Sequence, residues 1–166
     1  MKRTLFRGTT IGHWTHSRDK HGNYVGRKNY LSPTGFVTSF TTWPLKAMTY
    51  AVQRSEEVKN CILYEQSINL SDEEDCRVRI KESYPLILVL KNNGKYLPRP
   101  GLEPSEIEIF DPLPTRDLVV VNSLEKLSSC LLEYTVETGD FEAVGILRDY
   151  FKKHFLSSNR TVSLAS

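Results

Sequence analysis

Three short apolar segments of this chain each carry polar side chains that a buried strand has no structural need for. Arg7 follows an apolar pair and precedes Gly8, so its planar guanidinium, which suits phosphate oxygens, would lie where backbone can approach a ligand closely. Ser39 supplies a hydroxyl from the second segment. Glu106 and Glu108 lie two residues apart in the third, so an extended backbone directs both carboxylates to one face. Such a set could bind an anion such as a phosphate through the arginine and place two carboxylates beside it.

Each of these residues also has an ordinary structural explanation. Arg7 fits a surface arginine at a strand end, and Ser39 fits a cap at a strand-to-helix turn. The two glutamates fit an exposed edge strand whose inward face is formed by Ile107 and Ile109. Taken singly, none of the residues decides between structure and chemistry.

Their order along the chain resembles the arginine-serine-glutamate class of mono-ADP-ribosyltransferases. Phe6-Arg7-Gly8 resembles the arginine that follows an aromatic residue on that family's first strand. Ser39-Phe40-Thr41 resembles its Ser-Thr-Ser motif, with Phe40 and Thr41 departing from the usual Thr and Ser. A second register, with Thr38 and Ser39 as the later two positions, would place Val37 where the serine belongs. We prefer the first register because it keeps that serine.

The resemblance extends to the flanking residues. Pro44 and Ala47 fall where the family has Pro and Ala at the start of the next helix. The Gly/Pro-rich loop over 94–105 lies where the family has its target-recognition turn, so Tyr96 and Arg99 become candidates for contacting an acceptor protein.

The resemblance implies a role for each motif residue. Arg7 and Gly8, with Ser39-Phe40-Thr41, would bind NAD, and a ring from Phe40 or Trp43 could stack on nicotinamide. Glu108 would hydrogen-bond the ribose 2′-hydroxyl and stabilise the oxocarbenium-like transition state. Glu106 would position an acceptor, which is arginine in the matching members.

The implied protein is an α+β domain with an ADP-ribosyltransferase-like split β-sandwich, flanking helices and two C-terminal helices. Its implied activity is NAD-dependent transfer of ADP-ribose to a protein acceptor, without a metal, in a bacterial toxin or effector. Two alternatives stay open. One is a NAD glycohydrolase on the same fold, and the other is a non-catalytic module that binds nucleic acid or an acidic partner.

Length and composition favour one folded catalytic domain over 1–156, followed by a polar tail over 157–166. The net charge of +2 is too small to favour nucleic acid, although the segment 13–30 is locally basic and aromatic. The chain has no run long enough for a membrane span and no signal peptide. We therefore expect synthesis in the cytoplasm, no membrane partner, and three reduced cysteines. Secretion or delivery into a target cell stays open.

The hydrophobic patterning predicts the elements that must position these residues. A long loop is expected over 12–32. Strands are predicted over 3–7, 36–40, 61–68, 84–90, 106–110 and 117–121, and helices over 44–52, 124–137 with Ser123 as N-cap, and about 141–155.

Overall fold

The computed structural model describes residues 3–16, 29–31 and 37–156. Eight strands are present in these ranges: β1 (Arg3–Thr10), β2 (Tyr30–Leu31), β3 (Thr38–Thr41), β4 (Pro85–Asn92), β5 (Arg99–Pro100), β6 (Glu106–Ile109), β7 (Leu113–Pro114) and β8 (Leu118–Val121). The helices are α1 (Ile11–Thr15), α2 (Pro44–Ser67), α3 (Glu73–Glu82), α4 (Leu124–Thr138) and α5 (Ala143–Phe151), with a 3₁₀ turn at Thr115–Asp117 and a π turn at Lys152–Leu156.

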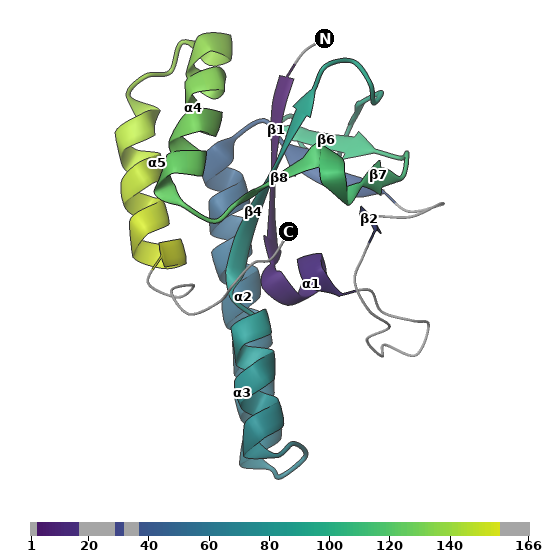
Figure 1. The fold of residues 1–166 in the computed structure, drawn as a ribbon, viewed down its shortest axis with the longest axis vertical. Helices are drawn as coiled ribbons and strands as arrows, with labels where there is room; N and C mark the ends of the chain where they lie inside the picture. Colours follow the sequence, from purple (N-terminus) through teal and green to yellow (C-terminus); the bar gives the residue numbers. More distant parts are fainter. Residues whose placement is uncertain (1–2, 17–28, 32–36, 157–166) are drawn as a thin grey trace.

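Six strands form one antiparallel sheet in the order β5-β6-β3-β1-β4-β8, and β2 pairs with β7 beside it. Figure 1 shows β6 and β7 to one side of the long strands β1 and β4, with α4 and α5 on the other side. The described part of the chain combines helices with an antiparallel sheet and does not repeat βαβ units. The predicted α+β class is therefore confirmed. The two predicted C-terminal helices are also present.

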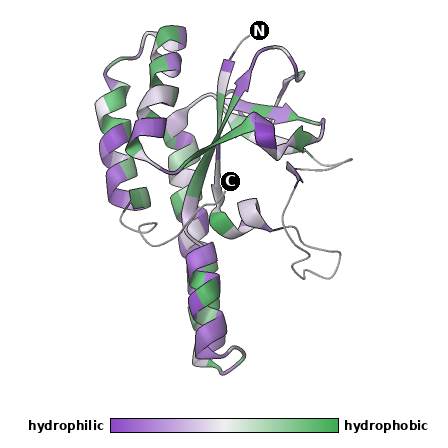
Figure 2. Cartoon of the chain, in the orientation of Figure 1, coloured by the Kyte–Doolittle hydropathy of each residue, from purple (hydrophilic) through white to green (hydrophobic). Residues whose placement is uncertain are grey.

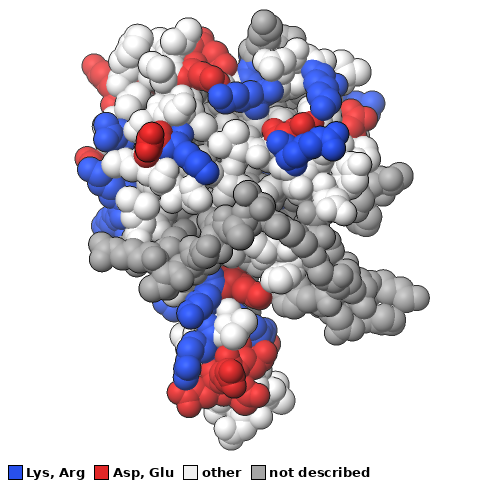
Figure 3. Space-filling view, viewed as in Figure 1, with Lys and Arg blue, Asp and Glu red and all other residues white. Residues whose placement is uncertain are grey.

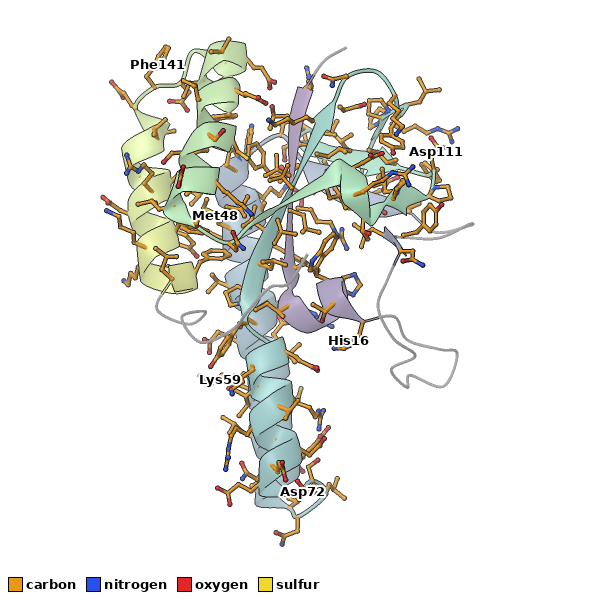
Figure 4. The ribbon with its side chains drawn as sticks, viewed as in Figure 1. His16, Met48, Lys59, Asp72, Asp111 and Phe141 are labelled. Atoms are coloured by element: carbon orange, nitrogen blue, oxygen red, sulfur yellow. The ribbon has the colours of Figure 1, made fainter. Side chains whose placement is uncertain are left out.

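The central strand β4 is buried on both faces, as its almost continuous apolar sequence predicts. Its residues Ile87 and Val89 pack into a cluster with helices α2, α4 and α5. Leu86, Leu88 and Leu90 point to the opposite face, where they pack with residues of β1, β3, β6 and β7. Met48, labelled in Figure 4, belongs to the helical cluster and is fully buried. The sheet therefore separates two apolar cores.

Helix α2 lies tightly against β1 because Gly8 faces it. A Cβ atom on Gly8 would overlap the carbonyl oxygen of Ala47 and lie 2.9 Å from the backbone nitrogen of Ala51. Pro44 occupies the first turn of α2, where its missing N–H costs no hydrogen bond. The prediction that β1 ends before Gly8 is wrong, since the strand continues to Thr10.

The predicted strand over 61–68 is wrong, because α2 continues unbroken from Pro44 to Ser67. Its buried positions Ala51, Ser55 and Ile62 follow helical spacing along the whole length. The segment from Gln53 to Asn60 contains neither Gly nor Pro, so nothing in it ends the helix.

Helix α3, which the sequence patterning did not predict, packs beside the second half of α2. Asp72 is its N-cap and accepts a hydrogen bond from the Asp75 backbone at 2.7 Å, and an ion pair between Arg79 and Glu65 joins the two helices. Figure 1 shows this helical hairpin projecting away from the rest of the molecule, and Figure 2 shows it as largely hydrophilic. Acidic side chains gather at its tip in Figure 3, from Asp72, Glu73, Glu74 and Asp75.

Most of the remaining predicted elements are present. The Ser123 hydroxyl accepts a hydrogen bond from the Lys126 backbone and caps α4 as predicted. The loop expected over 94–105 contains β5, which pairs briefly with β6. Most of the predicted 12–32 loop, the Pro33-Thr34-Gly35 turn and the 157–166 tail lie outside the described residues.

Candidate functional site

The strands that carry Arg7 and Ser39 separate beside these residues. Within the described part of the chain, β1 and β3 share one paired position, Phe6 with Thr41. In contrast, β1 pairs with β4 over its full length from Arg3 to Thr10. The sheet therefore splits along the β1–β3 line immediately after Phe6, and Arg7 is the first side chain at the split.

The Arg7 guanidinium bridges this split. Its Nη1 donates a hydrogen bond to the Ser39 carbonyl oxygen at 2.8 Å, whereas its buried Nε has no hydrogen-bond partner. Burial lowers the pKa of Arg7, and the nearby Tyr50 side chain partly offsets this effect. No carboxylate in residues 3–16, 29–31 or 37–156 pairs with Arg7. Because arginine stays protonated at neutral pH, the site holds a partly buried cation that lacks an anionic partner among the described residues.

A pocket of about 480 Å³ opens beside Arg7. Its walls come from β1, from β3, from the first two turns of α2 and from the loop before β6: Phe6, Arg7, Gly8, Val37, Ser39, Phe40, Thr41, Lys46, Ala47, Tyr50, Glu103 and Glu106. The N-terminal end of a helix carries partial positive charge, so the start of α2 adds to the field of Arg7. The pocket is large enough for a small organic ligand, and Arg7 offers that ligand a cation that no carboxylate of the described residues neutralises.

The two predicted carboxylates lie opposite the second motif. In the β3–β6 pairing, Ser39 faces Glu108 and Thr41 faces Glu106. Opposite residues of an antiparallel pair have Cβ atoms about 5 Å apart and project from the same face, so the prediction that both glutamates share a face is confirmed. The structure thus brings Arg7, Ser39 and Glu108 to neighbouring places on three adjacent strands. Glu106 lines the pocket, whereas Glu108, two residues farther along β6, does not.

The two glutamates differ in their surroundings. Glu106 Oε2 accepts a hydrogen bond from the Leu102 backbone at 3.2 Å, and its side chain packs so closely on Gly101 that a Cβ there would lie 2.7 Å from its Cδ. Glu108 is half-buried, and among the described residues its carboxylate has neither a hydrogen bond nor an ion pair. Glu106 is therefore held by its own loop, whereas Glu108 is available to a ligand.

One contact across the pocket was not predicted from the sequence. Lys46, in the first turn of α2, donates hydrogen bonds to a carboxylate oxygen of Glu103 and to Ser105 Oγ, the latter at 3.0 Å. The Thr42 backbone N–H also donates to the Ser105 carbonyl oxygen at 3.1 Å. These contacts fasten the loop before β6 to the start of α2. The only sequence signal for them is the position of Lys46 within the Pro44–Ala47 segment already noted.

The two residues predicted to contact an acceptor, Tyr96 and Arg99, differ in their exposure. Tyr96 is buried and its hydroxyl donates to Asp117, so the prediction that it contacts a partner is wrong. The apolar surroundings of its ring explain this burial. Arg99 is exposed on β5 directly opposite Glu108, and its guanidinium lies 4.7 Å from the centre of the Phe110 ring. Arg99 therefore remains accessible beside the site.

The two aromatic residues near Ser39, Phe40 and Trp43, also differ in their exposure. Phe40 is buried in the core on the far side of the sheet from α2, and contributes to the pocket wall. Trp43 is 60% exposed and does not line the pocket. Neither ring is free to stack on a ligand inside this pocket without rearrangement.

The described residues contain no group of three or more His, Cys, Asp or Glu side chains placed to hold a metal ion. None of the described helices is long and apolar enough to cross a membrane. Comparison with known proteins found no match to this chain among protein-family models, curated proteins or solved structures.

Proposed function

We propose that this chain is a NAD-dependent mono-ADP-ribosyltransferase. The observation that carries the proposal is the convergence of Arg7, Ser39 and Glu108 on adjacent strands, beside a pocket whose partly buried cation has no anionic partner among the described residues. Arg7 and Ser39 are 32 positions apart in the sequence, and Ser39 and Glu108 are 69 positions apart. The resemblance selected these three residues from the sequence alone. The split between β1 and β3 also supports a split β-sandwich of the transferase type.

The chemistry follows from the charges at the site. The guanidinium of Arg7 would bind pyrophosphate oxygens of NAD through Nε and Nη, since Nε has no other partner. The bond between ribose C1′ and the nicotinamide nitrogen then breaks, and its electron pair goes to the nicotinamide ring. The ribose left behind carries positive charge, which the Glu108 carboxylate would stabilise from beside the 2′-hydroxyl. An acceptor nucleophile attacks C1′ and loses its proton.

Ser39 would position the other two residues of the site, Arg7 and Glu108. The Ser39 backbone accepts the bond that fixes Arg7, and the Ser39 side chain shares a face with Glu108. Ser39 would thus keep the arginine and the carboxylate in a constant relation to each other. Delivery of the protein as a bacterial toxin or effector stays a prediction.

A NAD glycohydrolase is the second candidate, and one observation favours it. The Glu106 carboxylate, which should position a protein acceptor, is already hydrogen-bonded to the Leu102 backbone. A Glu106 carboxylate held toward its own loop would be less able to position a protein acceptor, so that water would be the nucleophile and free ADP-ribose the product.

The decisive experiment compares the wild type with Glu108→Gln, using NAD labelled in the adenylate part, with and without cell lysates. We expect Glu108→Gln to lower nicotinamide release by about 100-fold or more while NAD affinity stays within several-fold, because the carboxylate acts mainly in the transition state. Equal loss of binding and release would contradict the proposed role of Glu108.

The same assay separates the alternatives. Label on a discrete protein band, lost in Glu108→Gln, would establish a transferase, and nicotinamide release without a band would establish the glycohydrolase. Glu106→Gln should reduce protein labelling more than hydrolysis. Absence of both signals, with binding to nucleic acid or an acidic protein, would favour the non-catalytic module instead.

A further inference from the structure

The ion pair between Lys46 and Glu103 joins two walls of the pocket. Lys46 belongs to α2 and Glu103 to the loop that leads into β6, and both line the same pocket as Arg7. Lys46 also donates to Ser105 Oγ at 3.0 Å, so two of its possible donor positions point into the loop. The contact therefore holds the loop closed against the helix.

The pocket contains two cations in different states. Arg7 has no carboxylate partner among the described residues, whereas Lys46 is neutralised by Glu103. The other acidic side chain of the pocket, Glu106, is held by the Leu102 backbone rather than by either cation. A ligand with one negative charge needs only Arg7, whereas one with two separate negative charges would also benefit from Lys46.

The Lys46–Glu103 pair is suited to exchange its partner. The side chains of Lys46 and Glu103 are 38% and 62% exposed, and ion pairs exposed to this degree are weak. A phosphate group offers three acceptor oxygens and more negative charge than a carboxylate, so it competes well for an ammonium group. Glu103 lies in an exposed part of the loop and can turn to solvent without leaving a buried charge.

We propose that Lys46 is a second phosphate-binding side chain of this pocket and that Glu103 is its exchangeable counter-ion. A ligand containing a pyrophosphate would bind Arg7 and take Lys46 from Glu103, which frees the Glu103 part of the loop before β6, while the backbone hydrogen bond from Thr42 to Ser105 stays in place. The ligand class rests on the proposed function. The nucleotide then binds before the loop is free to meet an acceptor, so ligand and acceptor are added in that order.

The test measures ADP affinity by titration calorimetry at fixed ionic strength for the wild type, Glu103→Gln, Lys46→Met and the double variant. We expect Glu103→Gln to bind ADP about three- to tenfold more tightly, and Lys46→Met to bind it about tenfold more weakly. In the double variant the gain from Glu103→Gln should disappear, because the freed lysine is absent. Thermal melting of each variant checks folding, which substitution of two exposed side chains should preserve.

Glu133→Gln is the matched control. Glu133 pairs with Lys91 at 2.9 Å with both side chains 44% exposed, and neither residue lines the pocket. This variant changes the net charge as Glu103→Gln does, and we expect its ADP affinity to equal that of the wild type.

Three outcomes would overturn the inference. The first is unchanged ADP affinity in Glu103→Gln. The second is a gain in ADP affinity from Glu103→Gln that is equal with and without Lys46. The third is an equal gain in ADP affinity in Glu133→Gln. Unchanged ADP affinity in Glu103→Gln, together with normal nicotinamide release, would reject the exchange of partners at Lys46 and keep the proposed function. The expected affinity pattern without nicotinamide release would keep the exchange and reject the catalytic proposal. Failure of the wild type to bind ADP would reject the exchange, and nicotinamide release from NAD would still decide the proposed function.

Discussion

Arg7 is unusual because its charged side chain is partly buried and the described residues supply no counter-charge. Burying a guanidinium is costly unless its donors are satisfied, yet the buried Nε of Arg7 has no hydrogen-bond partner, while Nη1 donates to the Ser39 carbonyl oxygen. An apolar side chain of similar length would avoid that cost and fill the same space. The position therefore carries a penalty in stability that a bound anion would offset.

Substitution of Arg7 by Met tests this balance. We expect Arg7→Met to stay within about 1 kcal/mol of the wild type in free energy of unfolding, because the lost hydrogen bond is compensated by the removal of a buried charge. Its affinity for ADP should fall by about 100-fold, since the charge-assisted bonds to phosphate are lost. Urea unfolding and calorimetry measure the two effects.

Arg99→Met serves as the control for a general loss of positive charge, because Arg99 is exposed and lies outside the pocket. We expect it to bind ADP as the wild type does. A loss of stability above about 3 kcal/mol in Arg7→Met would mean that Arg7 is a structural residue.

For single residues, the sequence indicated which side chains could form the site but not which side chains contact one another across it. The order of Arg7, Ser39 and Glu108 was sufficient to select three residues that the fold brings together. The contact between Lys46 and Glu103 joins positions 57 apart, and both are ordinary charged residues in the sequence. Nothing local in either segment indicates such a pairing.

At the scale of elements, the contact between Gly8 and α2 decides how close the helix lies to the sheet. We expect Gly8→Ala to lower the free energy of unfolding by about 2 to 4 kcal/mol, because the added methyl group meets the backbone of Ala47 and Ala51, which cannot move independently. The same substitution should weaken ligand binding, since α2 supplies one wall of the pocket.

Gly145→Ala is the paired control for this prediction. Gly145 lies within α5 and an added Cβ would meet no atom within 4 Å, so Ala should stabilise the protein by about 0.5 to 1 kcal/mol. Equal effects of the two substitutions in urea unfolding would show that Gly8 is not a packing contact.

The errors in the predicted elements have a common cause. The segment Cys61–Ile68 has apolar and aromatic residues typical of a strand, but it continues a helix that no residue interrupts. Helix α3 has one buried side chain, Cys76, so its apolar periodicity is weak, although its Asp72 cap and terminal charges were visible in the sequence. Apolar pattern alone predicts helices poorly where two helices pack mainly on each other.

At the scale of the whole molecule, acid stability should depend on Asp117. Hydrogen bonds from Lys95 and then Tyr96 lower the pKa of Asp117 below its ordinary value of 3.8. A carboxyl group whose pKa is lower in the folded state stabilises the protein at neutral pH, and this contribution is lost as the pH falls below about 4 and through the lowered pKa. These contacts join the end of β4 to the start of β8.

We expect Asp117→Asn to lower the melting temperature at pH 7 and to approach the wild type as the pH is reduced from 4 to 2. Lys95→Met should reproduce part of this pattern, because it removes the first of the two donors. Melting curves over that pH range provide the measurement. A difference between Asp117→Asn and the wild type that is the same at pH 2 and pH 7 would exclude ionisation as the cause.

The hairpin of α2 and α3 places its tip far from the site. Figure 4 shows Asp72 at the end of the hairpin and Asp111, next to β6, in the opposite part of the molecule. Substitutions at the tip therefore report on the hairpin without disturbing the pocket.

The single paired position between β1 and β3 divides the main sheet into two plates. One plate is β1-β4-β8 and the other is β5-β6-β3, and each keeps its own ladder, with eight paired positions between β1 and β4 and four between β3 and β6. The Arg7 wall and the Glu106 wall of the pocket therefore belong to different plates, and across the described strands one ladder position and the Arg7–Ser39 hydrogen bond join these plates directly.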